Sequence, residues 1–406
     1  MSAPSDLMEW LTTEVIPKAI KNVNRTNMRY EFKCSQLENF HFMSEVFFAE
    51  IIFPNGQTDG KEQVLHVVVK VPPPNVHPRD KINMNKFFSN EILFYKEFVE
   101  NSSLYPRIFY GTSEEIDKTV IVMENVRQTR GFAMCPQLYD IPLKYVMSAV
   151  KELGRFHGYG YVMKDRRPDK LKNIIGKLQD GRFIDGEPFH IIINIVGTRP
   201  IEWLRTIDYD STFCDKMEKI FANAYENIMI DAIKPVEPLA VLIHGDFTGS
   251  NMFFKETSTG LDTMLIDFGM SRYTSPAIDL CTLLFLNATT DDRKYRFDNI
   301  FKAYHDSLLE YLSNAGIIQI EEYAIEKMLA DYKRRAAFGY MIAVYFLPTL
   351  RGCLKDIPGD IRVQSRQRVI EIANMIKAGG GEAASRMFGE MLIELREAGC
   401  LDHFLM

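Results

Sequence analysis

The pattern of hydrophobic and polar positions divides the chain into a strand-rich part and a helix-rich part. Apolar, β-branched runs that are typical of strands lie within residues 36–53, 62–74 and 118–132. Residues 87–101 carry the spacing of an amphipathic helix, and helical patterns dominate after the third strand run. We therefore expect a β-rich N-terminal lobe at residues 31–126, a mainly helical C-terminal lobe at residues 127–406, and a leading helical extension at residues 1–30.

Two further strands are predicted inside the helix-rich part. Residues 238–246 form one apolar run, and residues 261–269 form a second that follows the turn-rich segment 255–260. The longest apolar run, residues 336–350, is too short to span a bilayer. We expect it to form a buried helix that Pro348 ends or kinks.

Polar residues at the ends of these two strands have the spacing of a kinase catalytic centre. His244, Asp246 and Asn251 reproduce the pattern H-x-D-x-x-x-x-N, and Asp267 opens the triplet D-F-G. An Asp at the second position aims a carboxylate at the attacking hydroxyl. Carboxylate and amide oxygens suit Mg²⁺, so Asn251 and Asp267 are the predicted magnesium ligands and Asp246 the predicted catalytic residue.

Each of these residues has an ordinary interpretation when it is taken alone. A single Asp after a strand is usually a turn former or a helix cap. An imidazole beside a strand end usually hydrogen-bonds the backbone, so we expect His244 to be structural. The combination of both motifs at this spacing favours a kinase.

A nucleotide-binding half is predicted upstream. Lys70 ends the run VVVK before three prolines, as the lysine of a kinase V-A-I-K strand does. Glu91, on the following amphipathic segment, is the predicted partner that holds this lysine against the phosphates, although Glu97 and Glu100 are alternatives. A lysine at a strand end is otherwise simply solvated.

The connector after the third strand run and the phosphate lid complete this half. Glu124, Asn125 and Val126 fall where kinases hydrogen-bond adenine through backbone groups. The chain has no glycine before Gly56, so a glycine-rich lid is absent. Backbone amides of residues 39–44, with the Ser44 hydroxyl, are the predicted substitute, unless this segment is simply a half-buried hairpin strand.

The chain resembles the CHK kinase-like superfamily and, within it, the ecdysteroid-kinase-like family. The segments that carry the resemblance are LENFHFMSEVF, VVVKVPP, NEILFYKEF, VMENV, ELGRFHGYG, HGDFTGSNMFF, LIDFGMSRYTSPAIDL and FGYMIAVYFLP. Members of the family commonly have Gly where Leu37 stands and Gln where Gly269 stands, and they differ within the TGS of the loop. These departures leave the predicted catalytic residues in place and affect acceptor specificity.

The resemblance implies an α+β, bilobal protein-kinase-like fold, ATP and Mg²⁺ as cofactors, and a small-molecule alcohol as acceptor, in particular a lipophilic one such as an ecdysteroid. Two alternatives remain: a choline- or aminoglycoside-type kinase with a cationic acceptor, and a nucleotide-binding pseudokinase scaffold. A cationic acceptor favours an aromatic and carboxylate cage, whereas a steroid needs a large apolar cleft. A protein kinase is disfavoured because no A-P-E signature follows D-F-G.

Three residues after D-F-G have a predicted role or a structural alternative. Asp279 resembles the aspartate that anchors the catalytic loop backbone, and the alternative is an Asp favoured by a helix N-terminus. Arg272, next to Ser271, is placed to meet phosphate, although a structural contact is the favoured interpretation. Acceptor selection is expected from residues 200–209 and from helices after Asp291.

Composition and charge limit the class of protein. A chain of 406 residues with 46% hydrophobic content can form two lobes with a core in each. A net charge of −6 argues against a nucleic-acid partner. The six cysteines are far apart, and residues 1–10 have no apolar segment of a secretory signal, so we expect reduced thiols and a cytoplasmic location. The sequence does not indicate an oligomeric state.

Overall fold

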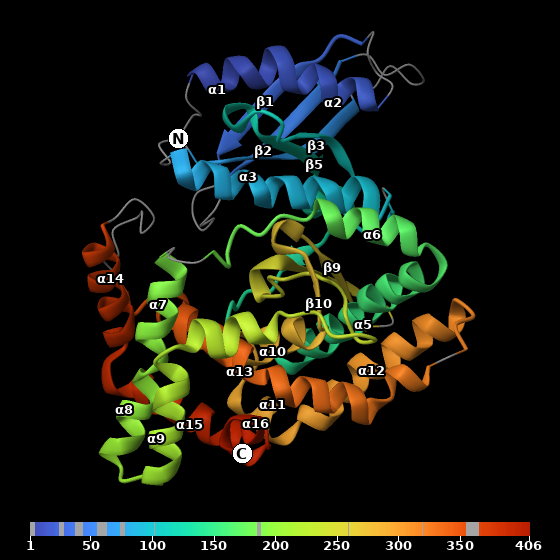
Figure 1. Cartoon of the computed structure of the whole chain (residues 1–406). Helices are drawn as coiled ribbons and strands as arrows, with labels where there is room; N and C mark the ends of the chain where they lie inside the picture. Colours follow the sequence, from blue (N-terminus) through green and yellow to red (C-terminus); the bar gives the residue numbers. More distant parts are fainter. Residues whose placement is uncertain are drawn as a thin grey trace. The chain divides into compact units, whose positions relative to one another are not determined.

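The structure is a computed structural model that describes residues 5–23, 28–36, 44–54, 63–73, 78–100, 102–184, 188–258, 260–318, 320–354 and 365–406. The chain forms two compact units (Figure 1). The first contains Met1–Ala133, Lys177–Gly181 and Ile266–Gly269. The second contains Met134–Gly176, Arg182–Leu265 and Met270–Met406.

The first unit is built on a five-stranded antiparallel sheet with the order β1-β2-β3-β5-β4. Its strands are β1 Glu31–Gln36, β2 Glu45–Phe53, β3 Gln63–Val71, β4 Ile108–Thr112 and β5 Val120–Glu124. β2, β3 and β5 lie in the three predicted strand runs. Their β-branched and aromatic residues suit a pleated, half-buried surface.

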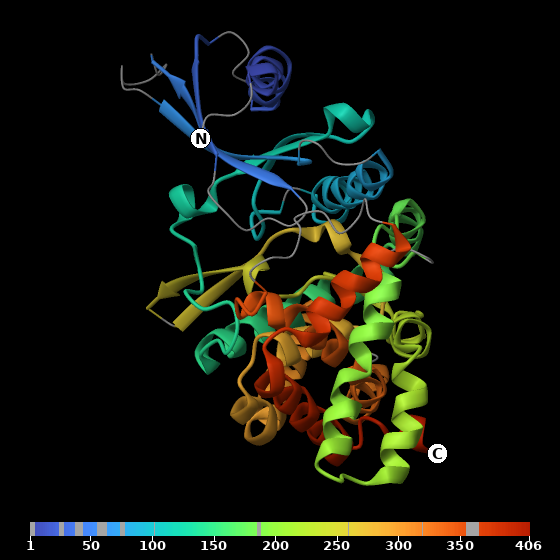
Figure 2. The ribbon, with the colours of Figure 1, turned by 90° about the vertical axis from the view of Figure 1, so that its left-hand side faces the viewer.

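The two faces of this sheet differ because side chains alternate along a strand. On β3, Val67, Val69 and Val71 are buried on one face, and Lys70 lies on the other. Helices α1 Ser5–Trp10 and α2 Ile16–Asn22, joined by a π-helical turn, cover the buried face (Figures 1 and 2). The N-terminal helices therefore contribute to the same core as the sheet.

The remaining elements of the first unit are short helices and turns that lie between the strands along the chain or follow β5. They are α3 Pro78–Leu93, a π-helical turn at Phe94–Phe98, a 3-10 turn at Ile116–Lys118 and α4 Val126–Arg130. The two-residue strand β6, Ala133–Met134, lies at the boundary of the two units.

The second unit is mainly helical and carries two short antiparallel pairs of strands. The pairs are β7 Val241–Ile243 with β10 Arg272–Thr274, and β8 Met252–Thr257 with β9 Gly260–Leu265. The helices are α5 Leu143–Arg166, α6 Pro168–Lys177, α7 Pro188–Gly197, α8 Arg199–Thr206, α9 Ser211–Phe221, α10 Ala277–Leu286, α11 Thr290–Tyr295, α12 Phe297–Asn314, α13 Ile325–Leu350, α14 Arg366–Ala378, α15 Gly381–Glu397 and α16 Asp402–Leu405.

Close helix pairs form the core of this unit. α5 packs along α12, and α10 packs along α13. A Cβ at Gly339 of α13 would lie 2.2 Å from the carbonyl oxygen of Cys281 on α10, so only glycine permits this approach. The buried helix expected at residues 336–350 is present as the end of α13, and Pro348 lies inside its last turn. No helix among the described residues is long and apolar enough to cross a membrane.

Candidate active site

The predicted partner of Lys70 is present in the first unit. Lys70 Nζ, on β3, donates a hydrogen bond to Glu91 Oε2, on α3, at 2.6 Å. The same ammonium donates to Asp267 Oδ1 at 2.8 Å. The Lys70 and Glu91 side chains are 13% and 2% exposed, so this contact is not a solvated surface pair. One ammonium therefore forms ion pairs with two carboxylates.

Burial and the unequal number of opposite charges together explain the pKa directions of Lys70 and Glu91. Burial opposes the charge of Lys70, but Asp267 and Glu91 outweigh it and raise the pKa of the ammonium above its usual value. Burial also raises the pKa of Glu91, and the neighbouring carboxylate of Asp267 adds to this while Lys70 opposes it. An additional positive charge at this cluster would relieve the repulsion between the two carboxylates.

The D-F-G segment is held in a specific conformation. Asp267 has a φ of +63°, a left-handed backbone that Asp adopts more readily than most residues. The ring of Phe268 stacks on Phe94, with centroids 3.4 Å apart and planes at 8°. Asn90 Nδ2 donates to the carbonyl oxygen of Gly269 at 3.0 Å. Asn90 and Phe94 lie on the predicted helix, but their contacts with D-F-G were not anticipated from the sequence.

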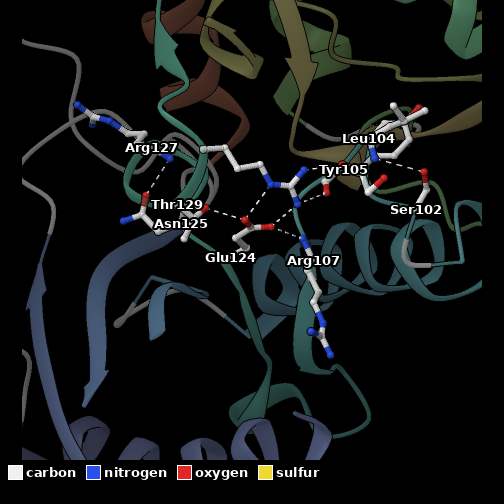
Figure 3. Close-up of polar contacts among 10 residues, drawn as sticks. Ser102, Leu104, Tyr105, Arg107, Glu124, Asn125, Arg127 and Thr129 are labelled. Carbon is white, nitrogen blue, oxygen red and sulfur yellow. Dashed lines mark hydrogen bonds and ion pairs between the residues drawn. The ribbon is translucent and has the colours of Figure 1, made fainter. Parts of the chain in front are cut away.

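The connector after β5 is shaped by its own side chains. Glu124 accepts hydrogen bonds from Arg130, Thr129 and the backbone N–H of Arg107 (Figure 3). Partial burial opposes the charge of Glu124, but the hydrogen bonds from Arg130 and Thr129 outweigh it and lower the pKa of the carboxyl. These contacts use the Glu124 side chain, and the backbone N–H of Glu124 donates to Arg107 O at 2.8 Å, which leaves the backbone carbonyl oxygen as the group that could meet a ligand.

Asn125 and Val126 continue the connector into α4. The Asn125 side chain accepts a hydrogen bond from the backbone N–H of Arg127 at 3.2 Å and caps the helix, and its own N–H donates to His66 O at 3.1 Å. Val126 is the first helical residue, where a backbone N–H has no intrahelical acceptor. The geometry therefore fits the backbone role that the sequence predicts for Val126, which stays a prediction.

A cavity of about 320 Å³ opens next to this connector in the first unit. Its lining includes Lys33, Phe48, Glu50, His66, Asn125 and Arg127. The sheet register pairs Val46 with Lys70 and Phe48 with Val68, so Phe48 and His66 share the sheet face that carries Lys70. Of the predicted lid, residues 39–43 lie outside the described residues, and Ser44 is buried immediately before β2.

The predicted catalytic loop lies in the second unit. It follows β7 and reaches a short 3-10 turn, Gly249–Asn251, before β8. Asn251 Nδ2 donates to both the carbonyl oxygen and Oδ2 of Asp246, each at 2.9 Å. The loop thus brings Asp246 and Asn251 together, and it leaves the amide oxygen of Asn251 directed away from these two bonds.

Asp279 anchors this loop as predicted. Its carboxylate is fully buried and accepts hydrogen bonds from the backbone N–H groups of His244, at 2.7 Å, and Gly245, at 2.8 Å. It also lies in the first turn of α10, so the helix N-terminus favours the same charge. His157, 3.2 Å from Asp279, completes the cluster; burial lowers the pKa of its imidazole. The role of His157 was missed from the sequence because α5 is remote along the chain.

Two residues at the start of the loop fix its shape. His244 is buried, and its Nδ1 accepts a hydrogen bond from the backbone N–H of Asp246 at 3.3 Å, a structural contact. Gly245 has a φ of +81°, and a Cβ there would lie 1.9 Å from the carbonyl oxygen of Met270. Only glycine fits this position.

Buried and half-buried aromatic side chains form a cluster in the second unit. The aromatic cluster comprises Phe183, Phe189, Tyr225, Phe338, Tyr345 and Phe346, whose neighbouring ring centroids lie 4.4 to 6.5 Å apart. Arg182 connects it to the catalytic loop, because Nη1 lies 4.0 Å from Asp246 Oδ1. The guanidinium of Arg272 lies 4.6 Å from the Phe183 ring centroid, which is a structural contact.

Of the two regions expected to select the acceptor, only the helices after Asp291 contribute to the aromatic cluster. Residues 200–209 form α8 and its C-terminal turn, and α8 packs on α9 and α15. Three residues of α13, a helix after Asp291, join the aromatic cluster: Phe338, Tyr345 and Phe346. Arg182 and Phe189 come from an earlier segment. No periodic pattern marks that segment, because it lies partly in a loop.

Comparison with known proteins identifies the family. The sequence profile of the ecdysteroid kinase-like family matches residues 38–317, more than half of the chain. The chain belongs to the ecdysteroid kinase-like family. As a member of it, the protein is a phosphotransferase that acts on an alcohol, and the β-rich first unit and helical second unit have the architecture of the protein-kinase-like fold.

Comparison with curated proteins and with solved structures gives more distant results. No curated protein matches this kinase-like chain. An ethanolamine kinase from Plasmodium vivax shares 12% identity at a TM-score of 0.45, with 93% of this chain and 89% of that chain covered. A choline kinase from Cryptosporidium parvum also shares 12% identity at a TM-score of 0.45, with 92% and 93% covered. A choline/ethanolamine kinase family protein from Mesorhizobium loti shares 13% identity at a TM-score of 0.37, with 95% and 99% covered.

The side chains that could bind a metal in this kinase-like protein suit magnesium. The described residues contain no group of three or more His, Cys, Asp or Glu side chains that could hold an ion by itself. Mg²⁺ is typically held by one or two protein oxygens together with water and substrate phosphates. The Asn251 amide, whose nitrogen is engaged with Asp246, and the Asp267 carboxylate are oxygen donors of this kind. Each of the two side chains therefore offers an oxygen of the kind that suits the expected metal.

Proposed function

We propose that this kinase transfers the γ-phosphate of ATP to the hydroxyl group of a lipophilic alcohol, with an ecdysteroid as the leading candidate. The observation that carries the proposal is the buried Lys70 ammonium shared between Glu91 and Asp267, at 2.6 and 2.8 Å. An ammonium held in this way on a strand is suited to bind the α- and β-phosphates of ATP. The aromatic cluster connected to Asp246 supports an acceptor with a large apolar surface.

The nucleotide would be bound by residues of the first unit. Lys70 contacts the phosphates, and Glu91 keeps its ammonium in place. The backbone groups of Glu124 and Val126 receive the adenine, and Ser44 contributes to the phosphate lid. The cavity of about 320 Å³ beside Asn125, on the Lys70 face of the sheet, supports this arrangement.

Asn251 and Asp267 are the proposed ligands of Mg²⁺. When bound, the ion neutralises charge on the β- and γ-phosphates and orients them. The contacts of these side chains support the assignment: Asn251 uses its nitrogen on Asp246, and Asp267 lies against Lys70. A divalent cation would also supply the positive charge that the cluster of Lys70, Glu91 and Asp267 lacks.

Asp246 is the proposed catalytic residue. Its carboxylate accepts a hydrogen bond from the acceptor hydroxyl and aims the oxygen at the γ-phosphorus. A bond forms between that oxygen and phosphorus, the bond from phosphorus to the β-phosphate oxygen breaks, and ADP leaves. Asp246 takes up the hydroxyl proton. Asn251 and the loop contacts of Asp279 hold the carboxylate in position.

One alternative has support of its own. A choline- or aminoglycoside-type kinase needs aromatic faces and a carboxylate for its cationic acceptor, and Phe189, Phe346 and Asp246 are groups of this kind. A pseudokinase scaffold would be expected to lack a metal ligand or the catalytic carboxylate, and this chain retains both. The predicted cytoplasmic location stays a prediction from the sequence.

The test is Mg²⁺-dependent release of ADP from ATP, measured with a panel of ecdysteroids, sterols, choline and aminoglycosides. Asp246→Asn is the matched control, because it keeps the size of the side chain and the bond from Asn251 but cannot take up a proton. We expect turnover with a lipophilic alcohol that falls at least 100-fold in Asp246→Asn. Turnover with choline alone would support the alternative, and turnover that is unchanged in Asp246→Asn would refute the assigned role.

A further inference from the structure

Arg182 is packed into the second unit in an unusual set of contacts. Its side chain is only 11% exposed, and Nη1 lies 4.0 Å from Oδ1 of Asp246. The guanidinium carbon lies 5.3 Å from the ring centroid of Phe189 and 5.5 Å from that of Phe346. Phe189 lies in the first turn of α7, and Phe346 lies near the end of α13, so two helices and a loop converge on one cation.

These three partners are the components of a cation-binding site. Aromatic faces attract a cation through the ring quadrupole, and a nearby carboxylate adds charge attraction. In this chain the guanidinium of Arg182 already occupies the faces of the Phe189 and Phe346 rings. A second arginine, Arg396 on α15, makes a similar set of contacts with Tyr209, Asp210 and Phe213, at and just before the start of α9.

We propose that Arg182 is a specificity residue that excludes cationic alcohols from the position next to Asp246. The inference rests on the proposed role of Asp246 in the function above. An amino alcohol whose hydroxyl lies on Asp246 carries its charged nitrogen only two carbons away, and therefore close to the guanidinium. An uncharged alcohol meets no such repulsion, so the acceptor class is a neutral one.

The size of the effect follows from Coulomb's law. Two like charges about 6 Å apart, in surroundings with an effective dielectric constant of about 20, disfavour binding on the order of 100-fold. The loss of the ring faces to Arg182 adds to this discrimination. Removal of the guanidinium should therefore open a site for a cation rather than simply weaken the enzyme.

The experiment compares the full chain with Arg182→Ala, Arg182→Lys and Arg396→Ala. Binding of tetramethylammonium is measured by titration calorimetry or NMR, and choline turnover is measured by ADP release. We expect no binding in the parental protein and a dissociation constant on the order of 1 mM in Arg182→Ala. Choline turnover should rise on the order of 100-fold in the same variant. Arg182→Lys keeps the charge and should exclude the cation, and Arg396→Ala should behave as the parental protein.

Each other outcome overturns the inference. Binding of tetramethylammonium to the parental protein would show that Arg182 does not block the site. Absence of binding in Arg182→Ala, with a thermal unfolding transition like that of the parental protein, would show that Asp246 and the two rings form no cation site. A loss of turnover with every acceptor, with KM unchanged, would instead assign Arg182 to the phosphate.

The result also separates this inference from the proposed function. Tetramethylammonium binding requires no turnover, so it tests the role of Arg182 even if no acceptor in the panel is phosphorylated. Failure of the proposed function would appear as absent ADP release while the pattern of cation binding holds. Failure of the inference would appear as a wrong binding pattern while a neutral alcohol is turned over.

Discussion

Replacement of Asp279 by Ala tests how the catalytic loop is held. The Asp279 carboxylate is fully buried and accepts hydrogen bonds from the backbone N–H groups of His244 and Gly245, and it lies 3.2 Å from His157. Alanine removes every acceptor atom and leaves the two donors facing a cavity. No rotation of the loop can satisfy both, because Gly245 already lies against the backbone of Met270.

The magnitude follows from the number of donors that lose their partner. Each unsatisfied buried N–H costs about 1–3 kcal/mol, so the two together should lower the free energy of unfolding by about 2–6 kcal/mol. This is a large share of the roughly 5–15 kcal/mol that stabilises a typical domain. In the fraction that remains folded, a misplaced Asp246 should lower kcat on the order of 100-fold.

Urea unfolding, with ADP release on the best acceptor, measures both effects. Asp292→Ala is the matched control, because Asp292 is also a buried carboxylate in the first turn of a helix and accepts a hydrogen bond from Thr289 at 2.7 Å. Its loss should cost about 1 kcal/mol. If Asp279→Ala costs no more than Asp292→Ala and leaves kcat unchanged, Asp279 is only a helix N-terminal charge and the reasoning is refuted.

Three further substitutions test other parts of the structure. Gly245→Ala places a Cβ 1.9 Å from a backbone oxygen at a φ of +81°, so ADP release should be lost and the Tm should fall; normal activity would contradict the loop geometry. Burial raises the pKa of Glu91 from 4.5 to about 7, so ionisation of this carboxyl lowers the stability of the folded protein as pH rises between these values. In urea unfolding, the free energy of unfolding of Glu91→Gln should therefore fall by about 3 kcal/mol less than that of the parental protein between pH 5 and 8. Parallel pH profiles of the two proteins would argue against the shift. Gly339→Ala forces a Cβ to 2.2 Å from Cys281 and should cost about 1–3 kcal/mol, whereas Gly176→Ala, with no atom within 4 Å, should be neutral or stabilising; equal effects would count against close packing of α10 on α13.

Much of the candidate site could be predicted because its residues are tied to local patterns. The spacing of Asp246 and Asn251 within one loop allows a direct bond, and that bond is present. The alternation along β3 places Lys70 on the face opposite the buried valines, and the amphipathic segment that follows carries Glu91. The anchoring position of Asp279 was also indicated, by its resemblance to a kinase motif.

Other contacts could not be predicted because they join remote parts of the chain. Asn90 reaches Gly269 across 179 positions, and nothing in the helix pattern says which carbonyl a polar residue will meet. Likewise, the N-terminal helices were expected as an extension, but their apolar stripe completes the core under the sheet. A pattern of apolar positions says that a face is buried and leaves the covering element open.

The sequence by itself determined the class of chemistry, because Asp246 and Asn251 lie five positions apart in one short loop and the alternation along a strand fixes the sheet face of Lys70. Only the tertiary structure decided the surroundings of that chemistry. Arg182 looks like any charged loop residue until α7 and α13 bring Phe189 and Phe346 to it. Charge and ring contacts depend on distance in space, and side chains more than 150 positions apart acquire that distance only when the helices pack.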